Sequence, residues 1–320
     1  MMIKALIFTL LFMSPLMTSA SDFFSLSALK AADNKPLSPL QYVKATDGLL
    51  LAYRPYFPQQ AQAVLIFLHG GGAHSGLSYN HIGVGLRDDF DIAVYMPDIR
   101  GHGSSEGARG DAPNKEQVWA DINTIVQQAR RRYPQQPIFV GGHSSGAGLA
   151  LNYSSWQQRA EIDGYVFLAP YFGYKSETNH DADKSERVEF SSVKTTKFIL
   201  NTVSFGLLAG HDKAVIFHFP EQVLKNNPEI VTFNTVNMAN ALTPSSPDSQ
   251  FADIGSFGLW IGAQDEAFDA VKVIAFAQEH AGKDNAGKDR NEIKMLQDEN
   301  HFSIILSGAK YIGPWLVRSR

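Results

Sequence analysis

Apolar and polar positions change along the chain in blocks that predict strands and helices in turn. Residues 63–68 are apolar at every position, which is typical of a strand buried on both faces of a sheet. Further along the chain, the pattern predicts strands over 92–96, 138–140 and 165–168 and helices over 117–133 and 147–156. This alternation favours a mostly parallel sheet with helices on both faces.

Two further regions belong to the same predicted sheet. Residues 41–45 and 49–56 are strand-like runs joined by Thr46-Asp47-Gly48, and an Asp-Gly pair between such runs is typical of a hairpin. Near the other end, we expect a strand over 257–261, a helix over 267–280 and a strand over 292–296.

Between these regions, residues 171–255 show no clear alternation of strand and helix. A stretch of this length is too long for an ordinary connection between two core strands. We therefore predict an inserted cap or lid over 171–255, with the core formed by 40–170 and 256–320 and a lead-in over 21–39. The apolar run within 198–208 is typical of the buried side of a cap helix, although it would also suit an acyl-chain pocket or contact with a membrane.

The first twenty residues resemble an export signal. Lys4 supplies a positive charge, residues 5–13 form an uncharged apolar run, and Thr18-Ser19-Ala20 offers small residues for cleavage. The apolar run is too short to span a bilayer comfortably. We expect a signal peptide over 1–20, cleaved near Ala20, and a periplasmic or secreted protein that begins at Ser21.

The composition of the chain limits the kinds of molecule that it is expected to bind. The 320-residue chain is 44% hydrophobic with a formal net charge of −4, and it contains no cysteine. Nothing in this balance calls for a nucleic acid, and the lack of cysteine excludes disulfides, a cysteine nucleophile and cysteine metal ligands. No cofactor is implied, and the sequence does not indicate an oligomeric state.

Gly142-His143-Ser144-Ser145-Gly146 is a G-x-S-x-G motif between a predicted strand and a predicted helix. A strand that turns directly into a helix holds the central residue at the tip of a strained turn. Ser144 is therefore the candidate nucleophile. The helix start behind it directs N–H groups towards the same place.

Two further side chains follow the ends of predicted strands. Asp265 follows residues 257–261, and His301 follows residues 292–296, so both are expected at the edge of the sheet that carries Ser144. A serine needs a base that accepts its proton near neutral pH, and the base needs a carboxylate that orients it. We predict His301 and Asp265 for these roles, with Glu266 and Asp269 as rival acids.

An oxyanion hole is expected from two backbone N–H groups, those of Gly71 and Ser145. Gly71 lies in His69-Gly70-Gly71-Gly72, after the first buried strand, and this loop lacks the ending of a phosphate-binding P-loop. Several histidines lie in or beside these loops, but their spacing fits no trusted metal motif, so we predict no metal site and assign them packing or hydrogen-bonding roles: His69, His74, His102 and His143.

These motifs together resemble the monoacylglycerol lipase and lysophospholipase branch of the serine α/β-hydrolases, which includes some aminopeptidases. The resemblance is carried by residues 69–75, by Asp98-Ile99-Arg100-Gly101-His102-Gly103-Ser104-Ser105-Glu106-Gly107 and by the motif at Ser144, and it covers about residues 40–315. It implies an α/β-hydrolase fold, a triad of Ser144, Asp265 and His301, and an oxyanion hole at Gly71 and Ser145. Ser145 stands where such proteins often carry Met, and Phe302 where an acidic residue is common.

The sequence thus predicts a serine hydrolase that cleaves carboxylic esters through an acyl-enzyme. Monoacylglycerols or lysophospholipids are the expected substrates, with peripheral membrane contact through the cap as an open alternative. A general short-chain carboxylesterase and an aminopeptidase remain alternatives, and the latter would need a carboxylate in the cap, for which the candidates are Glu177, Asp181, Asp183 and Glu186. A binding protein without catalytic activity is disfavoured, because all three catalytic residue types are present.

Overall fold

The computed structural model describes residues 35–181, 190–282 and 291–319. The predicted signal peptide and most of the predicted lead-in lie outside these ranges. The first described residues contact the core: the carbonyl of Ser38 accepts a hydrogen bond from Arg54 Nη1 (2.6 Å), and the carbonyl of Lys35 accepts one from Asn80 Nδ2 (2.6 Å).

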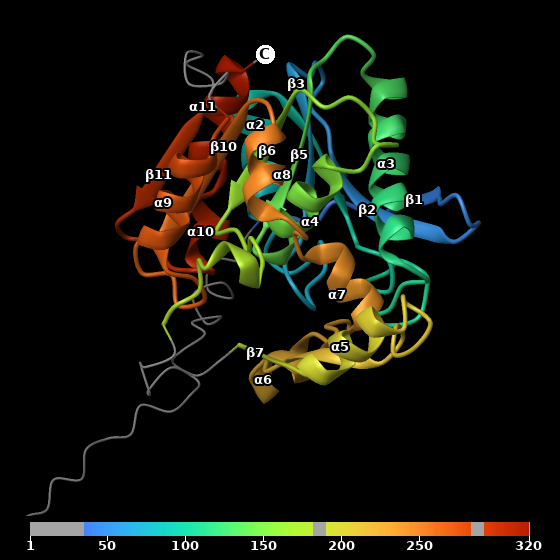
Figure 1. Cartoon of the computed structure of the whole chain (residues 1–320). Helices are drawn as coiled ribbons and strands as arrows, with labels where there is room; N and C mark the ends of the chain where they lie inside the picture. Colours follow the sequence, from blue (N-terminus) through green and yellow to red (C-terminus); the bar gives the residue numbers. More distant parts are fainter. Residues whose placement is uncertain (1–34, 182–189, 283–290, 320) are drawn as a thin grey trace, which may run out of the picture.

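An eight-stranded sheet forms the centre of the molecule (Figure 1). The order of strands is β1-β2-β4-β3-β5-β6-β10-β11, with β1, β2 and β4 joined by antiparallel pairing and the other pairs parallel. The strands are β1 Gln41–Lys44, β2 Leu50–Tyr56, β3 Ala63–Leu68, β4 Ile92–Pro97, β5 Ile138–His143, β6 Gly164–Leu168, β10 Phe257–Gly262 and β11 Glu292–Leu296. The mostly parallel sheet predicted from the sequence is confirmed.

Helices cover both faces of the sheet, as the fully apolar strand at 63–68 predicts. In β3, Val64, Ile66 and Leu68 face one hydrophobic core, and the residues between them face the other. The flanking helices are α2 Asn80–Phe90, α3 Lys115–Arg132, α4 Ser145–Ser154, α9 Ala270–His280, α10 Ser303–Ser307 and α11 Ala309–Arg318. Side chains of α3, α4 and α9 contribute to the first core, and those of α2, α10 and α11 to the second.

The chain between β6 and β10 contains regular elements that the sequence pattern did not predict. They are η1 Tyr174–Ser176, β7 Ser191–Val193, α5 Thr195–Val203, β8 Lys213–Phe217, α6 Glu221–Asn226, β9 Phe233–Thr235, α7 Val236–Leu242 and α8 Pro247–Asp253. The strands form a small antiparallel sheet, β7-β8-β9. Each is only three to five residues long, which is too short to give a legible period.

These inserted elements divide into two groups. Helices α7 and α8 pack against α3 and α4, and their apolar residues Met238, Leu242 and Phe251 belong to the core of the eight-stranded sheet. In contrast, α5, α6 and β7 lie together at one end of the molecule, away from the flanking helices (Figure 1). We use "cap" below for residues 190–235, which contain β7 to β9.

The apolar run on α5 and in the loop that follows it is exposed, which contradicts its interpretation as the buried side of a cap helix. Val203 is 67% exposed, Phe205 94% and Leu207 86%. Helix α5 instead directs Asn201 inward, where its side-chain amide donates to the carbonyl of Leu208 (2.8 Å). None of the helices in the described ranges is long and apolar enough to cross a membrane.

Candidate active site

Ser144 occupies the turn between β5 and α4. Its backbone has φ 55° and ψ −123°, a conformation outside the usual regions for a residue with a side chain. The turn is held from both sides, because the Ser144 N–H donates to the carbonyl of Leu168 (3.0 Å) and its carbonyl accepts from the N–H of Tyr171 (3.1 Å).

The two glycines of the motif are required by close backbone contacts. A Cβ atom on Gly142 would lie 2.6 Å from the carbonyl oxygen of Leu68, and one on Gly146 would lie 2.4 Å from the same oxygen and 2.5 Å from that of His69. Strand β5 and helix α4 therefore approach the end of β3 too closely for any side chain at these positions.

Asp265 and His301 form a buried pair. The Nδ1 atom of His301 lies 2.9 Å from Oδ2 of Asp265, whose side chain is completely buried. The other carboxylate oxygen of Asp265 accepts the backbone N–H groups of Ala267 (2.9 Å) and Phe268 (2.8 Å). These bonds fix the carboxylate, so the imidazole donates through Nδ1 and leaves Nε2 as the acceptor.

The rival acids have other positions. Glu266 Oε2 accepts the backbone N–H of His301 (2.9 Å), and Asp269 caps helix α9 by accepting the N–H groups of Val271 and Lys272. Asp265 is thus the carboxylate that contacts the imidazole ring.

The surroundings of His301 make its imidazole easier to protonate than the imidazole of an ordinary histidine. Burial disfavours the imidazolium, but the charge and hydrogen bond of Asp265, together with the charge of Glu266, outweigh it and raise the pKa of His301. For Glu266, burial is the main cause and raises the pKa of the carboxyl group. Among the described contacts, no hydrogen bond joins Ser144 to His301.

His143, the second residue of the G-x-S-x-G motif, connects the Ser144 turn to both neighbouring loops. Its Nε2 donates to the carbonyl of His301 (2.8 Å), so its Nδ1 accepts from the hydroxyl of Tyr79 (3.0 Å). The Tyr79 oxygen in turn accepts the N–H of Gly70 (2.8 Å). Burial, followed by the neighbouring charge of His301, lowers the pKa of His143 well below its usual value, which keeps the ring neutral for these bonds.

The backbone N–H groups of Gly71 and Ser145 remain free to donate a hydrogen bond. Within the described ranges, neither has a hydrogen-bond partner, whereas the N–H of Gly70 is taken by Tyr79. Gly71 lies close to Ser145, since a Cβ on Gly71 would lie 3.3 Å from Ser145 Oγ. The two N–H groups predicted as an oxyanion hole therefore belong to neighbouring segments beside Ser144.

The other histidines near the site have structural partners. His69 Nε2 accepts the N–H of Ile99 (3.0 Å), and His102 Nδ1 lies 3.0 Å from the carbonyl of Arg100. Burial is the main cause that lowers the pKa of His69 to about 3 and that of His102 to about 4, so both rings stay neutral. No group of side chains in the described ranges could hold a metal ion.

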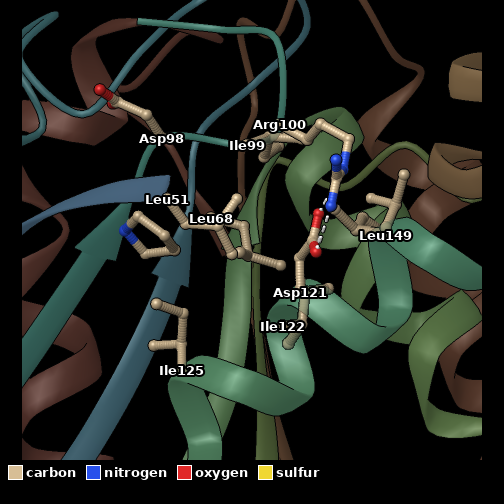
Figure 2. Close-up of a pocket in the computed structure, with 11 residues that line it drawn as sticks. Leu51, Leu68, Asp98, Ile99, Arg100, Asp121, Ile122, Ile125 and Leu149 are labelled. Carbon is tan, nitrogen blue, oxygen red and sulfur yellow. Dashed lines mark hydrogen bonds and ion pairs between the residues drawn. The ribbon is translucent and has the colours of Figure 1, made fainter. Parts of the chain in front are cut away.

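A small cavity lies beside the Asp98–Gly107 loop and is separate from Ser144 and His301. Its volume is about 20 Å³, and apolar residues such as Leu68, Ile122 and Leu149 line most of it. Figure 2 shows the Arg100 guanidinium at this cavity, paired with Asp121 (2.7 Å). Arg100 also binds Asp47 in the β1–β2 turn (2.7 Å), so it fastens the loop to the core.

Phenylalanines of the cap cover the glycine loop. A Cβ on Gly71 would lie 2.8 Å from the ring of Phe217, and one on Gly72 would lie 2.9 Å from Phe219. Phe190 packs against both rings, 5.5 Å from Phe217 and 5.0 Å from Phe219, and its ring is 6.4 Å from that of Phe302. We call Phe190, Phe217, Phe219 and Phe302 the aromatic cluster.

A comparison with models of protein families shows which family this chain is related to. The model of the serine aminopeptidase S33 family matches residues 59–249, which include β3, the Ser144 turn and the cap. The chain belongs to this family. Its curated relatives include the monoglyceride lipase of Rattus norvegicus, 26% identical over 181 residues, or 56% of this chain and 57% of the rat protein. The monoacylglycerol lipase of Mycolicibacterium smegmatis is 30% identical over 124 residues, or 38% of this chain and 43% of that protein.

These curated relatives match this S33-family chain over only about half of their own length. Solved structures match it more completely. A soluble variant of monoglyceride lipase from Saccharomyces cerevisiae, in complex with a substrate analog, covers 89% of this chain and 97% of its own, with a TM-score of 0.66 at 15% identity. The α/β-hydrolase fold expected from the sequence is therefore confirmed.

Proposed function

We propose that this protein is a serine hydrolase that cleaves carboxylic esters of lipids through an acyl-enzyme. The observation that carries the reaction type is the buried Asp265–His301 pair (2.9 Å) next to the strained turn at Ser144. Membership of the S33 family, whose relatives include monoglyceride lipases, supports the same conclusion.

In this proposal, Ser144, Asp265 and His301 act as nucleophile, orienting acid and base. Nε2 of His301 takes the proton of Ser144 Oγ, which attacks the ester carbonyl carbon. The N–H groups of Gly71 and Ser145 stabilise the oxyanion, and His301 returns the proton to the leaving alkoxide. Water then attacks the acyl-enzyme by the same route and regenerates Ser144.

The proposed substrate class is a monoacylglycerol or lysophospholipid. The aromatic cluster offers apolar rings directly above the glycine loop, where the acyl chain of a bound ester would begin. The exposed apolar residues Val203, Phe205 and Leu207 give the cap a surface suited to peripheral contact with a lipid membrane. Export after cleavage near Ala20 belongs to the same proposal.

The test is hydrolysis of p-nitrophenyl esters from acetyl to palmitoyl, beside a monoacylglycerol and aminoacyl p-nitroanilides, with Ser144→Ala as the blank. We expect kcat/KM to rise with acyl length and Ser144→Ala to lose turnover. A fluorophosphonate should label the native protein and leave Ser144→Ala unlabelled.

Other outcomes would redirect the assignment. Full activity in Ser144→Ala would overturn the nucleophile, and cleavage limited to short esters would leave a general carboxylesterase. Anilide cleavage with little ester activity would favour an aminopeptidase. Four carboxylates of the predicted insertion 171–255 are candidates for that activity: Asp181 is paired with Lys272, Glu177 is exposed, and Asp183 and Glu186 lie outside the described residues.

A further inference from the structure

The hydroxyl of Ser145 is buried without a hydrogen-bond partner in the described structure. Ser145 is the first residue of α4, and the other hydroxyls of this segment behave differently. Ser154 Oγ donates to the carbonyl of Leu151 (2.7 Å), and Ser155 Oγ donates to that of Asn152 (2.9 Å). Serines on helices commonly bond to the preceding turn in this way, but the residues before Ser145 belong to β5 and the Ser144 turn, so no helical turn precedes it.

The same hydroxyl faces the glycine loop. Ser145 Oγ lies 3.3 Å from the position of a Cβ on Gly71, whose N–H is one of the two oxyanion donors proposed above. The ring of Phe217 lies beside the same position, 2.8 Å from that Cβ. The hydroxyl therefore lies between two segments that both present unpaired N–H groups, in a place shielded by an aromatic ring.

A buried hydroxyl without a partner is unfavourable, and a negatively charged oxygen is the acceptor that most fully compensates it. Ordinary structural roles do not apply to Ser145 Oγ, since it neither bonds to a preceding turn nor pairs with another side chain. An acceptor that forms only during the reaction would satisfy it, and the oxyanion of a tetrahedral intermediate is such an acceptor.

We propose that the Ser145 hydroxyl is a third oxyanion donor, in addition to the backbone N–H groups of Gly71 and Ser145. The inference rests on the proposed function. The hydroxyl keeps its proton throughout: it donates a hydrogen bond to the oxyanion as the bond from Ser144 Oγ to the carbonyl carbon forms. It releases that bond when the carbonyl is restored and the leaving group departs.

The test compares Ser145→Ala and Ser145→Thr with Ser154→Ala, a matched loss of a hydroxyl at the other end of α4. Each is assayed with p-nitrophenyl butyrate and with a trifluoromethyl ketone, which forms a tetrahedral adduct with the active serine. Loss of one oxyanion donor typically lowers kcat by about 10²–10³-fold. Because two N–H donors remain, we expect Ser145→Ala to lower kcat by about 10- to 100-fold with KM nearly unchanged.

The ketone should lose affinity in Ser145→Ala by a similar factor, and Ser145→Thr, which keeps a hydroxyl, should recover most of the kcat. Ser154→Ala should change the melting temperature and leave kcat unaltered. Native kcat and ketone affinity in a folded Ser145→Ala would overturn the proposal, as would a rise in KM alone. Inactivity of the native protein would instead refute the proposed function, so the two failures are distinguishable.

Discussion

His301 is held at three points, two of them on the adjacent residues Asp265 and Glu266 and the third on His143 beside Ser144. Its ring binds Asp265, its backbone N–H binds Glu266, and its carbonyl accepts from His143. Only the first of these was predicted from the sequence, because Asp265 directly follows a strand. The contacts of Glu266 and His143 join a side chain to a backbone atom 35 and 158 residues away, respectively, and no local pattern encodes such a pair.

The pH dependence of hydrolysis follows from the environment of His301. A protonated His301 cannot accept the proton of Ser144, so kcat/KM should fall as the pH decreases through the raised pKa of His301. We expect the midpoint above 6.5, the ordinary value for histidine. Asp265→Asn removes the main contribution that raises this pKa, while burial still lowers it. The midpoint should therefore move to lower pH, and kcat should fall by about 10⁴-fold.

Measurement of kcat/KM between pH 4.5 and 9 checks this expectation. Glu266→Gln serves as the control, because its amide oxygen can still accept the N–H of His301 while only the more distant charge is lost. It should move the midpoint slightly in the same direction and retain most of the kcat. A midpoint that stays unchanged in Asp265→Asn would contradict the assignment of the acid.

At the scale of elements, the sequence best predicts those strands and turns where packing in the core requires particular residues. The close approach of β5 and α4 to the end of β3 requires glycine at 142 and 146, which is why the motif could be read before the structure. Helix α2 was not predicted, because glycines at 83 and 85 dilute its helical pattern. Their small size is needed here: a Cβ on Gly83 would lie 2.4 Å from the ring of Tyr56.

The aromatic cluster gives a prediction about acyl-chain preference. Phe217 is 8% exposed and is the cap side chain nearest Gly71, so its ring should contact the first carbons of an acyl chain. Loss of a buried phenylalanine contact is worth about 1.5–3 kcal/mol when complete. For Phe217→Ala we expect kcat/KM for p-nitrophenyl octanoate to fall by about 10-fold, a partial loss, with less than about a threefold change for the acetate.

Phe233→Ala is the matched control, because Phe233 lies on the adjacent strand β9 with its ring beneath Lys213 Nζ (3.9 Å). This variant should leave the ratio of octanoate to acetate activity unchanged. Equal ratios in Phe217→Ala and the native protein would show that the acyl chain binds elsewhere, and melting temperatures would separate this result from a loss of stability.

At the scale of the molecule, the sequence predicted the hydrolase core far better than the cap. Buried strands such as residues 63–68 are apolar throughout because helices cover both faces, and this pattern is legible without a structure. The cap has no such two-sided core. Its strands are short, and α5 exposes Ile199 and Val203 while burying the polar Asn201, which reverses the pattern on which such predictions depend.

The exposed apolar surface of the cap gives the last prediction, which concerns lipid vesicles. Phe205 and Leu207 are 94% and 86% exposed, and burying two such side chains in a membrane interface would contribute roughly 3–6 kcal/mol. The net charge of −4 gives no general attraction to anionic lipid, so zwitterionic phosphatidylcholine vesicles are the suitable probe.

We expect the native protein to sediment with these vesicles and Phe205→Glu/Leu207→Glu to lose at least about 10-fold in partitioning, because the glutamates replace this apolar contact by charge. Val271→Glu on α9 alters another exposed apolar residue, outside the cap (68% exposed), and should bind vesicles like the native protein. Hydrolysis of soluble p-nitrophenyl acetate should be the same in all three proteins. Undiminished sedimentation of the double variant would refute membrane contact through this surface.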